Sequence, residues 1–116
     1  MKKTPKTTYL LIALGVVLIA ALAFIFRQPK AILFYSSSCP HCQKVEQYIT
    51  DNGVRQKLKF RELEVSANQA NAQILEGKAR ACGLNTDQGV GIPLFFDGQK
   101  CYSGDTDIIT YFQTLK

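Results

Sequence analysis

The sequence predicts an α/β domain that is preceded by one transmembrane helix. Three observations indicate this architecture: an uncharged apolar stretch over residues 9–26, short apolar runs that alternate with helical periodicity over residues 31–115, and a turn pair at Asp97-Gly98. After the first helix the predicted order is β-α-β-α-β-β-α. The chain of 116 residues suffices for one small domain beyond that helix.

The apolar stretch from Tyr9 to Phe26 contains no charged residue. At 1.5 Å per residue such a helix spans roughly 27 Å, which is enough to cross the hydrocarbon core of a bilayer. Basic residues lie on both sides of it: Lys2, Lys3 and Lys6 before it, and Arg27 and Lys30 after it. Because the free amino group adds charge to the leading side, we expect the N-terminus in the cytoplasm and the rest of the chain on the extracytoplasmic (periplasmic or extracellular) side.

A cleaved signal peptide is the alternative interpretation of this stretch. Ala21-Leu22-Ala23 matches an A-x-A cleavage site, and the basic start suits a signal peptide. Against cleavage, Phe24 to Phe26 continues the apolar run where a mature protein usually starts with polar residues. We therefore favour an uncleaved single-pass anchor over residues 1–29, held in the membrane by residues 9–26, and a separate domain over residues 30–116.

The basic charge of the chain belongs to the membrane segment. The net charge is +5, yet from Ala31 onward nine Lys and Arg residues balance nine Asp and Glu residues. The excess comes from the five basic residues that flank the apolar stretch. A neutral domain lacks the electrostatic footprint of a nucleic-acid-binding protein, so we expect no nucleic-acid partner.

Two cysteines three residues apart follow the first predicted strand. Residues 31–35 are short and apolar, which is typical of a buried strand. Downstream, Cys42, Val45 and Ile49 recur at the spacing of one apolar helix face. This pattern places Cys39 at the tip of a helix and Cys42 deeper, facing the core.

The sequence Cys39-Pro40-His41-Cys42 predicts a redox-active dithiol. Free backbone N–H groups and the helix dipole favour a thiolate at Cys39, and Pro40 fits the first helical turn. His41 can donate a hydrogen bond or carry positive charge near that sulfur. A stabilised thiolate is a good leaving group, so we assign Cys39 as the attacking sulfur and Cys42 as the resolving sulfur.

The middle of the domain contains a strand and a helix. Asp51-Asn52-Gly53 predicts the end of the first helix. Residues 58–65 alternate apolar and charged side chains with one slip near Arg61, as in a half-buried strand at a sheet edge. Ser66 is the expected N-cap of a second helix that runs to about Cys82 and ends at Gly83. Its expected core face is Ile74, Leu75, Ala79 and Cys82.

A hairpin and a last helix complete the predicted order. Residues 92–96 form a strand led by Pro93, and Asp97-Gly98 predicts a two-residue turn. A type I′ turn there places Phe96 opposite Gln99 and Leu94 opposite Cys101. The final helix opens near Asp105, with a core face of Ile108, Phe112 and Leu115.

Residues 30–116 resemble the thioredoxin superfamily in its minimal glutaredoxin-like form. Three matches carry the resemblance: the strand, Cys-x-x-Cys and helix over residues 34–49, the Gly91-Ile92-Pro93 loop, and the spacing from Pro93 through Gly104 to Asp107-Ile108. The resemblance implies a mixed four-stranded sheet with helices on both faces. It also implies a cis peptide bond before Pro93 and a substrate chain that pairs with the backbone of Ile92 while Cys39 attacks.

The tetrapeptide of residues 39–42 is also the one found in the disulfide oxidase DsbA, and it is similar to that of thioredoxin-like domains that partner vitamin K epoxide reductase-type quinone reductases. These likenesses imply a thiol–disulfide oxidoreductase that acts on exported protein thiols and disulfides. Nothing in the sequence demands more than a monomer, and we expect no cofactor or metal. They imply reoxidation by a membrane quinone reductase of the vitamin K epoxide reductase or DsbB type. We favour oxidation of substrates over reduction, because His41 stabilises the thiolate.

Two positions depart from the family pattern. Thioredoxins carry a buried Asp where this chain has Leu33, so proton transfer at Cys42 must use water or another group such as Glu46 or Lys44. Glutaredoxins bind the carboxylate of the γ-glutamyl group of glutathione just after their glycine. This chain has Asp105 there, which repels a carboxylate and argues against specific glutathione binding.

Cys82 and Cys101 form a second pair of cysteines. An even cysteine count in an oxidising compartment favours pairing, and this disulfide would close a loop of about twenty residues. In the chain-entropy model that loop stabilises the fold by about 3 kcal/mol. The alternative is two separate buried thiols that act as small apolar residues.

Two other function classes fit the same motif. Thiolates at Cys39 and Cys42 can hold Cu(I) or Zn(II) in a metal carrier or sensor, although a zinc site needs two further ligands. A redox-inert module that holds an extended peptide beside Pro93 is the second alternative. Metal retention by the reduced domain distinguishes the first alternative, and an unchanged role after Cys39→Ser distinguishes the second.

Overall fold

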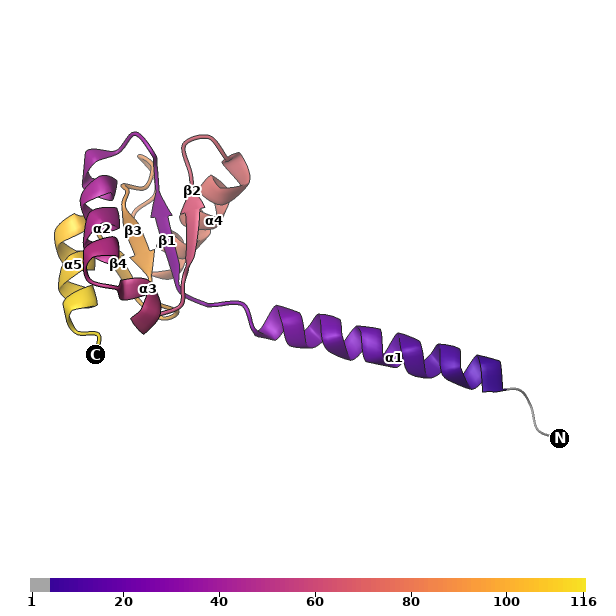
Figure 1. Cartoon of the computed structure of the whole chain (residues 1–116). Helices are drawn as coiled ribbons and strands as arrows, with labels where there is room; N and C mark the ends of the chain where they lie inside the picture. The colour runs from indigo at the N-terminus through magenta and orange to yellow at the C-terminus, as the bar shows by residue number, and fades with distance from the viewer. Residues whose placement is uncertain (1–4) are drawn as a thin grey trace.

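The computed structural model describes residues 5–116, and it contains a helical stalk and a single α/β domain (Figure 1). Helix α1 (Pro5–Phe26) has no buried residue, and it is long and apolar enough to cross a membrane. It starts four residues before the predicted apolar stretch. Lys2 and Lys3, which contributed to the predicted orientation, lie outside the described residues.

The domain contains the predicted order with one added helix. Its elements are β1 (Ile32–Tyr35), α2 (Pro40–Asp51), α3 (Val54–Lys57), β2 (Arg61–Glu64), α4 (Gln69–Ala81), β3 (Leu94–Phe96), β4 (Cys101–Ser103) and α5 (Asp105–Gln113). The short helix α3 was not predicted, because four residues show no helical repeat. The buried side chain of Val54 holds it against the core.

The four strands form one mixed sheet in the order β2-β1-β3-β4. Strand β1 pairs parallel with β2 and antiparallel with β3, and β3 pairs antiparallel with β4. The expected mixed sheet is confirmed, and so is the edge position of β2. Because β1 and β2 are parallel, both begin at the end of the sheet that faces α1.

Helices cover both faces of the sheet. On one face α2 and α5 enclose a core of Leu33, Val45, Ile49, Phe95, Ile108 and Phe112. On the other face α4 packs against β1 and β3 through a core of Ile32, Phe34, Leu75, Ala79, Leu94 and Phe96. Neither core includes a residue of α1, so the hydrophobic interior of residues 31–115 is complete without the stalk.

The slip predicted near Arg61 has a clear structural meaning. Leu58 and Phe60 pack on the core beneath α2 and α5, whereas Leu63 and Val65 pack on the core beneath α4. The chain therefore changes faces where β2 begins, and β2 is shorter than the predicted strand.

The start of α4 differs from the prediction. Its N-cap is Asn68, whose side chain accepts the backbone N–H of Asn71 at 3.1 Å. Ser66, the predicted cap, instead donates its hydroxyl to Glu64 and accepts a hydrogen bond from Ser36. Ile74 was predicted in the core but is 36% exposed, since the buried face of α4 is centred on Leu75 and Ala79.

The predicted hairpin register is wrong by two residues. Phe96 lies opposite Cys101 and Leu94 opposite Ser103. The Asp97 backbone N–H donates to the Lys100 carbonyl at 3.0 Å, so the two turn residues are Gly98 and Gln99 rather than Asp97 and Gly98. The Asp97 side chain explains the shift, because it accepts the backbone N–H groups of both Gln99 and Lys100 at 2.7 Å.

Candidate active site

The dithiol lies where β1 passes into α2, at the end of the sheet away from α1 (Figure 1). Cys39 is the N-cap of α2 with extended backbone angles, and Pro40 occupies the first helical position. The backbone N–H of Cys42 points at the Cys39 sulfur, with a nitrogen–sulfur distance of 3.2 Å. An N-terminal N–H group of the helix thus hydrogen-bonds the sulfur of Cys39, which favours negative charge on that atom.

The two sulfurs have different environments. Cys39 is half-buried, whereas Cys42 lies in the core beneath the helix start and is only 4% exposed. Burial raises the pKa of Cys42 to about 12, and the hydrogen bond with the Cys39 sulfur adds to the rise. Cys42 therefore holds its proton at neutral pH, while Cys39 is the accessible sulfur.

The loop before β3 lies against the helix tip. The Ile92–Pro93 peptide bond is cis, and Pro93 is fully buried. The Ile92 carbonyl oxygen lies 4.0 Å from the Cys39 sulfur. From the other side, the backbone N–H of Gly104 donates to the Pro93 carbonyl at 2.9 Å, which ties this loop to the start of α5.

The hydrogen bond of His41 goes to a residue that sequence reasoning did not connect with it. The His41 Nδ1 atom lies 3.2 Å from an Asp105 carboxylate oxygen, and Lys44 Nζ lies 3.6 Å from the same oxygen. The bond with His41 is the main reason that the pKa of Asp105 falls below its usual value. Asp105 therefore faces two basic side chains of α2. The contact with His41 was not predicted, because the two residues are 64 positions apart in sequence.

A cavity of about 400 Å³ opens beside the buried sulfur of Cys42. Leu33, which stands where thioredoxins carry a buried acid, lines it, and so do Glu46, Arg55 and Glu62. Arg55 bridges the two carboxylates, at 2.6 Å from Glu46 and 2.8 Å from Glu62. Carboxylates thus lie in the cavity beside Cys42, although none is present at position 33 itself.

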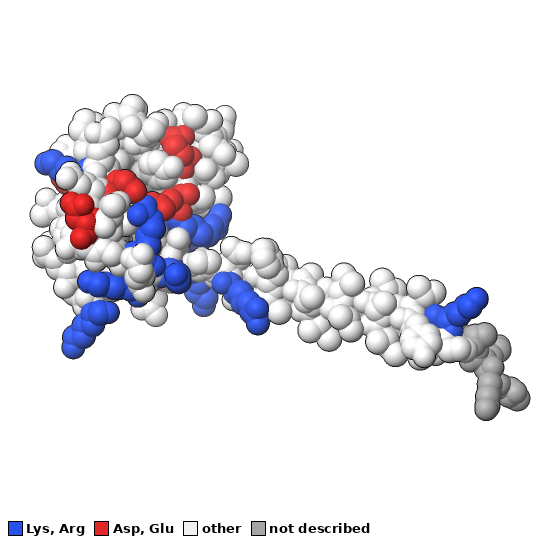
Figure 2. Space-filling model, in the orientation of Figure 1, with Lys and Arg blue, Asp and Glu red and all other residues white. Residues whose placement is uncertain are grey.

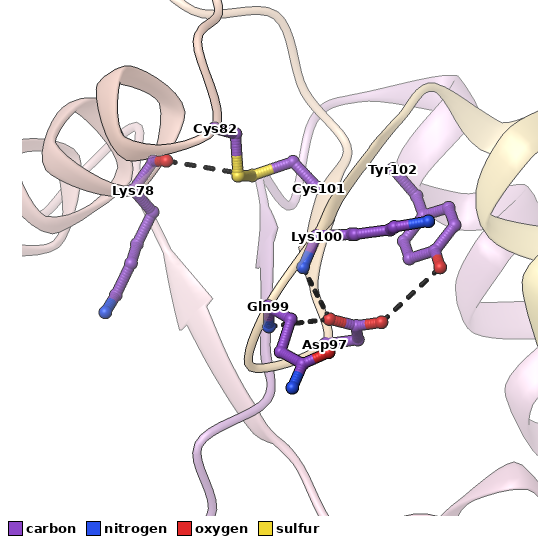
Figure 3. The surroundings of a disulfide bond; sticks show 7 residues. All are labelled: Lys78, Cys82, Asp97, Gln99, Lys100, Cys101 and Tyr102. Carbon is purple, nitrogen blue, oxygen red and sulfur yellow. Dashed lines mark hydrogen bonds between the residues drawn. A yellow bond between two sulfur atoms is a disulfide. The ribbon is translucent and has the colours of Figure 1, made fainter.

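Cys82 and Cys101 form a disulfide between the end of α4 and strand β4, with Cα atoms 6.0 Å apart (Figure 3). Figure 3 shows the Lys78 carbonyl oxygen beside the bond, 3.7 Å from the Cys101 sulfur. Of the two alternatives for these cysteines, the structure contains the bonded one. The disulfide joins the two ends of the segment that carries Pro93, and it lies outside the helix-tip dithiol.

No ready-made metal centre accompanies the dithiol within residues 5–116. In that part of the chain, no three or more His, Cys, Asp or Glu side chains are grouped so that they could hold an ion. A metal bound there would have Cys39 and Cys42 as its thiolate ligands and would need others from outside the domain.

The domain was compared with known proteins. A wheat glutaredoxin superposes with a TM-score of 0.53 and 23% identity over 81% of this chain and 79% of that chain. Glutaredoxin C1 from Populus tremula x tremuloides gives 0.51 and 21% over 73% and 75%. Reduced Escherichia coli glutaredoxin gives 0.51 and 18% over 72% and 92%. The fold is that of the glutaredoxins.

This likeness is one of fold. The sequence matches no protein-family model and no curated protein. The similarity concerns the arrangement of the four-stranded sheet and its helices, within which β1, α2 and the cis Ile92–Pro93 loop surround Cys39.

Proposed function

We propose that the chain is a membrane-tethered thiol–disulfide oxidoreductase that works outside the cytoplasm through Cys39 and Cys42. The observation that carries the proposal is the hydrogen bond from the Cys42 backbone N–H to the Cys39 sulfur, at the start of α2 and beside the Ile92–Pro93 loop. Helix α1 supports the tether, and we propose residues 1–29 as the anchor and residues 30–116 as the catalytic domain.

In the proposed reaction the oxidised protein carries a Cys39–Cys42 disulfide. A substrate thiolate attacks the Cys39 sulfur, the disulfide breaks, and Cys42 leaves as a thiolate that takes up a proton. A second thiolate of the substrate then attacks its own sulfur in the mixed disulfide and releases Cys39 as a thiolate. The substrate loses two electrons to the dithiol, and its new disulfide departs.

The surrounding residues have separate roles in this proposal. Ile92 and Pro93 orient the substrate backbone beside the Cys39 sulfur, while Pro40 sets the start of α2. His41 supplies a hydrogen-bond donor or positive charge at the helix tip, shared with Asp105. The carboxylate of Glu46, one helical turn after Cys42, exchanges the proton of the buried thiol through the cavity.

We propose that proteins, rather than glutathione, are the substrates. The Asp105 carboxylate occupies the helix start where glutaredoxins receive a carboxylate of glutathione. The same carboxylate oxygen already contacts His41 Nδ1 and Lys44 Nζ, so these two groups are occupied within the domain.

The direction of electron flow follows from the stability of the Cys39 thiolate. A reduced form stabilised by the helix start and by His41 makes the disulfide oxidising, and a membrane quinone reductase is our proposed electron acceptor. Reduction of exported disulfides would use the same atoms with a different electron donor.

The test uses residues 30–116 with Cys39→Ser and Cys42→Ser, assayed by oxidation of reduced ribonuclease and by reduction of insulin. We expect C39S to lose both activities and C42S to accumulate a mixed disulfide through Cys39. Full activity of C39S would refute the proposal, and so would stoichiometric retention of Cu(I) or Zn(II) by an inactive wild type.

The direction is tested separately by the reduction potential of the dithiol. A value near the −120 mV of DsbA is expected for an oxidase. A value near the −270 mV of thioredoxin would instead assign a reductase.

A further inference from the structure

The charges of residues 31–116 balance in number but not in position. Parallel strands β1 and β2 both begin at the end of the sheet next to α1, with Arg61 paired to Ile32. Strand β3 ends there too, since Phe96 also pairs with Ile32. Every residue that leads into β2 or forms the β3–β4 turn therefore lies at the end facing the membrane helix.

Basic side chains gather at that end. We call it the tether-side face, and it comprises the exposed residues Lys30, Lys57, Lys59, Arg61, Lys100 and Lys116. Gly98 in the turn lies against Lys30, and α5 runs from the dithiol end toward this face, which brings the C-terminal Lys116 to it. Figure 2 shows blue atoms grouped over the part of the domain beside α1, with red atoms farther from it.

Acidic side chains dominate the opposite end. Asp105 and Asp107 start α5 beside the dithiol, and Glu64 ends β2. Acids also lie at or near the tether-side face: Asp51 ends α2, Asp97 has its carboxylate already bound by backbone N–H groups of the hairpin, and Glu62, next to Arg61, is paired with Arg55. Residues 31–116 thus have no net charge, but they form a strongly basic face at one end of the domain and an acidic face at the other.

The connection to α1 keeps the basic face close to the bilayer. Helix α1 ends at Phe26 and β1 begins at Ile32. The six Cα-to-Cα steps between these two residues reach at most about 22 Å when fully extended. The lipid field falls off within one Debye length, about 8 Å at physiological salt, and this short connection lets the face approach the headgroups to within that distance.

We propose that the tether-side face binds the anionic headgroups of the membrane that α1 spans, so that the domain lies on the lipid with Cys39 directed away from it. This inference rests on the proposed tethering and not on the proposed redox chemistry. Each Lys or Arg near an anionic bilayer strengthens binding about fivefold, so several together give measurable binding without α1.

Residues 30–116 provide the test, because both hydrophobic cores are complete without α1. Cosedimentation is measured with vesicles of phosphatidylcholine alone and with 30% phosphatidylglycerol, at low and high salt. We expect binding to the anionic vesicles only, with loss at high salt. Equal binding to both vesicle types would overturn the proposal, as would stronger binding to an anionic oligonucleotide than to the vesicles.

Two matched variants locate the surface. K57Q/K59Q/R61Q removes three charges from the tether-side face and should weaken vesicle binding at least tenfold. Q69E/Q73E/Q88E changes the net charge equally at exposed sites on α4 and the loop after it, and should bind within twofold of the wild type. Equal effects of the two variants would refute a localised face.

Failure of docking and failure of the proposed function are distinguishable. In the full chain, K57Q/K59Q/R61Q should remain in the membrane fraction through α1 and keep wild-type thiol exchange. Loss of membrane association in that variant would show that α1 is no anchor and would remove the basis of the inference. Loss of exchange activity would overturn the assignment of these three residues to docking alone.

Discussion

At the scale of residues, depth along α2 separates the two sulfurs. Cys39 caps the helix and receives a backbone N–H, whereas Cys42 is three residues farther on and lies in the core. Burial, more than any charge, makes Cys42 hold its proton. The Cys39 sulfur is thus available for attack, whereas the Cys42 thiol reacts only after it has transferred its proton to an acceptor.

The first prediction concerns alkylation of the reduced domain. At pH 7.5 iodoacetamide should modify Cys39 at least about a hundredfold faster than Cys42. Only thiolates react, and a pKa near 12 means that very little of Cys42 is present as thiolate. Between pH 7 and 9 the rate at Cys42 should rise about tenfold per pH unit. Peptide mass mapping measures both rates, and equal labelling of the two sulfurs at pH 7.5 would contradict the assignment.

The second prediction concerns Glu46. In the reduction of insulin, where Cys42 attacks the mixed disulfide, replacement by Gln should slow this step by about tenfold or more, since a positioned base is lost. The rate is measured by single-turnover quench, and alkylation of Cys39 should be unchanged.

Glu62→Gln is the matched control for this role. Glu62 lines the same cavity and binds the same Arg55. If both variants slowed resolution equally, Glu46 would act through the ion-pair network rather than as proton acceptor.

At the scale of elements, the β3–β4 hairpin and α4 hold the loop that faces the dithiol. The disulfide ties the end of α4 to β4, and Asp97 organises the turn through its carboxylate (Figure 3). Figure 3 also shows the Tyr102 hydroxyl directed at Asp97, 3.4 Å from its second oxygen. These contacts hold both ends of the segment that contains Pro93.

The third prediction concerns the pH dependence contributed by Asp97. Burial opposes its ionisation, but backbone N–H groups of Lys100 and Gln99 and the Tyr102 hydroxyl together lower the pKa of its carboxyl. The stabilisation is present above the unfolded pKa of about 3.9 and is lost as pH falls through the lower folded value. D97N should therefore lose about 1 kcal/mol at pH 7 and much less near pH 2.5, measured by urea unfolding.

Asp87→Asn is the control for this measurement. Its side chain is exposed in the loop before β3, and its carboxylate makes no hydrogen bond among the described residues. Its effect on the free energy of unfolding at pH 7 should be within about 0.5 kcal/mol, as for most exposed substitutions. A D97N penalty that persists at pH 2.5 would assign the effect to turn geometry instead of charge.

The fourth prediction concerns the disulfide. C82A/C101A removes a cross-link between residues 19 apart and should lower the free energy of unfolding by about 3 kcal/mol. Urea unfolding measures the difference, and the reduced wild type should show most of it. An unchanged midpoint would mean that the bond does not form in the folded protein.

In the whole molecule, the stalk and the domain are separate structures that differ in where their apolar side chains lie. Helix α1 exposes apolar side chains along its whole length, and it is long and apolar enough to cross a membrane. The domain buries its own apolar residues in two cores and carries the dithiol at the end away from the stalk.

The fifth prediction tests this division. The full chain should stay in the membrane fraction after alkaline carbonate, with an intact mass that includes residues 1–29. Residues 30–116 should be soluble and should unfold in one cooperative transition, because no core residue is removed. A mature protein that begins after Ala23 would identify a cleaved signal peptide and refute the anchor.

Local sequence patterns were sufficient to predict the order of the strands and longer helices and the position of the dithiol at a helix start. These features depend on local signals, namely the apolar periodicity around Cys42, the proline at the first helical position and the uncharged stretch before the domain. The same locality explains what was mistaken. A turn dipeptide at Asp97 did not reveal which residues would accept the backbone N–H groups, so the hairpin register was two residues off.

The contacts between side chains that are distant in sequence became known only from the tertiary structure. Three groups of residues come together in the folded domain: His41 with Asp105, Arg55 with Glu46 and Glu62, and Cys82 with Cys101. The basic face has the same origin, since its residues come from the linker after α1, the segment from the end of α3 to the start of β2, the β3–β4 turn and the C-terminus. Local sequence patterns do not predict these contacts, because the contacts depend on strand pairing and helix packing rather than on neighbours in sequence.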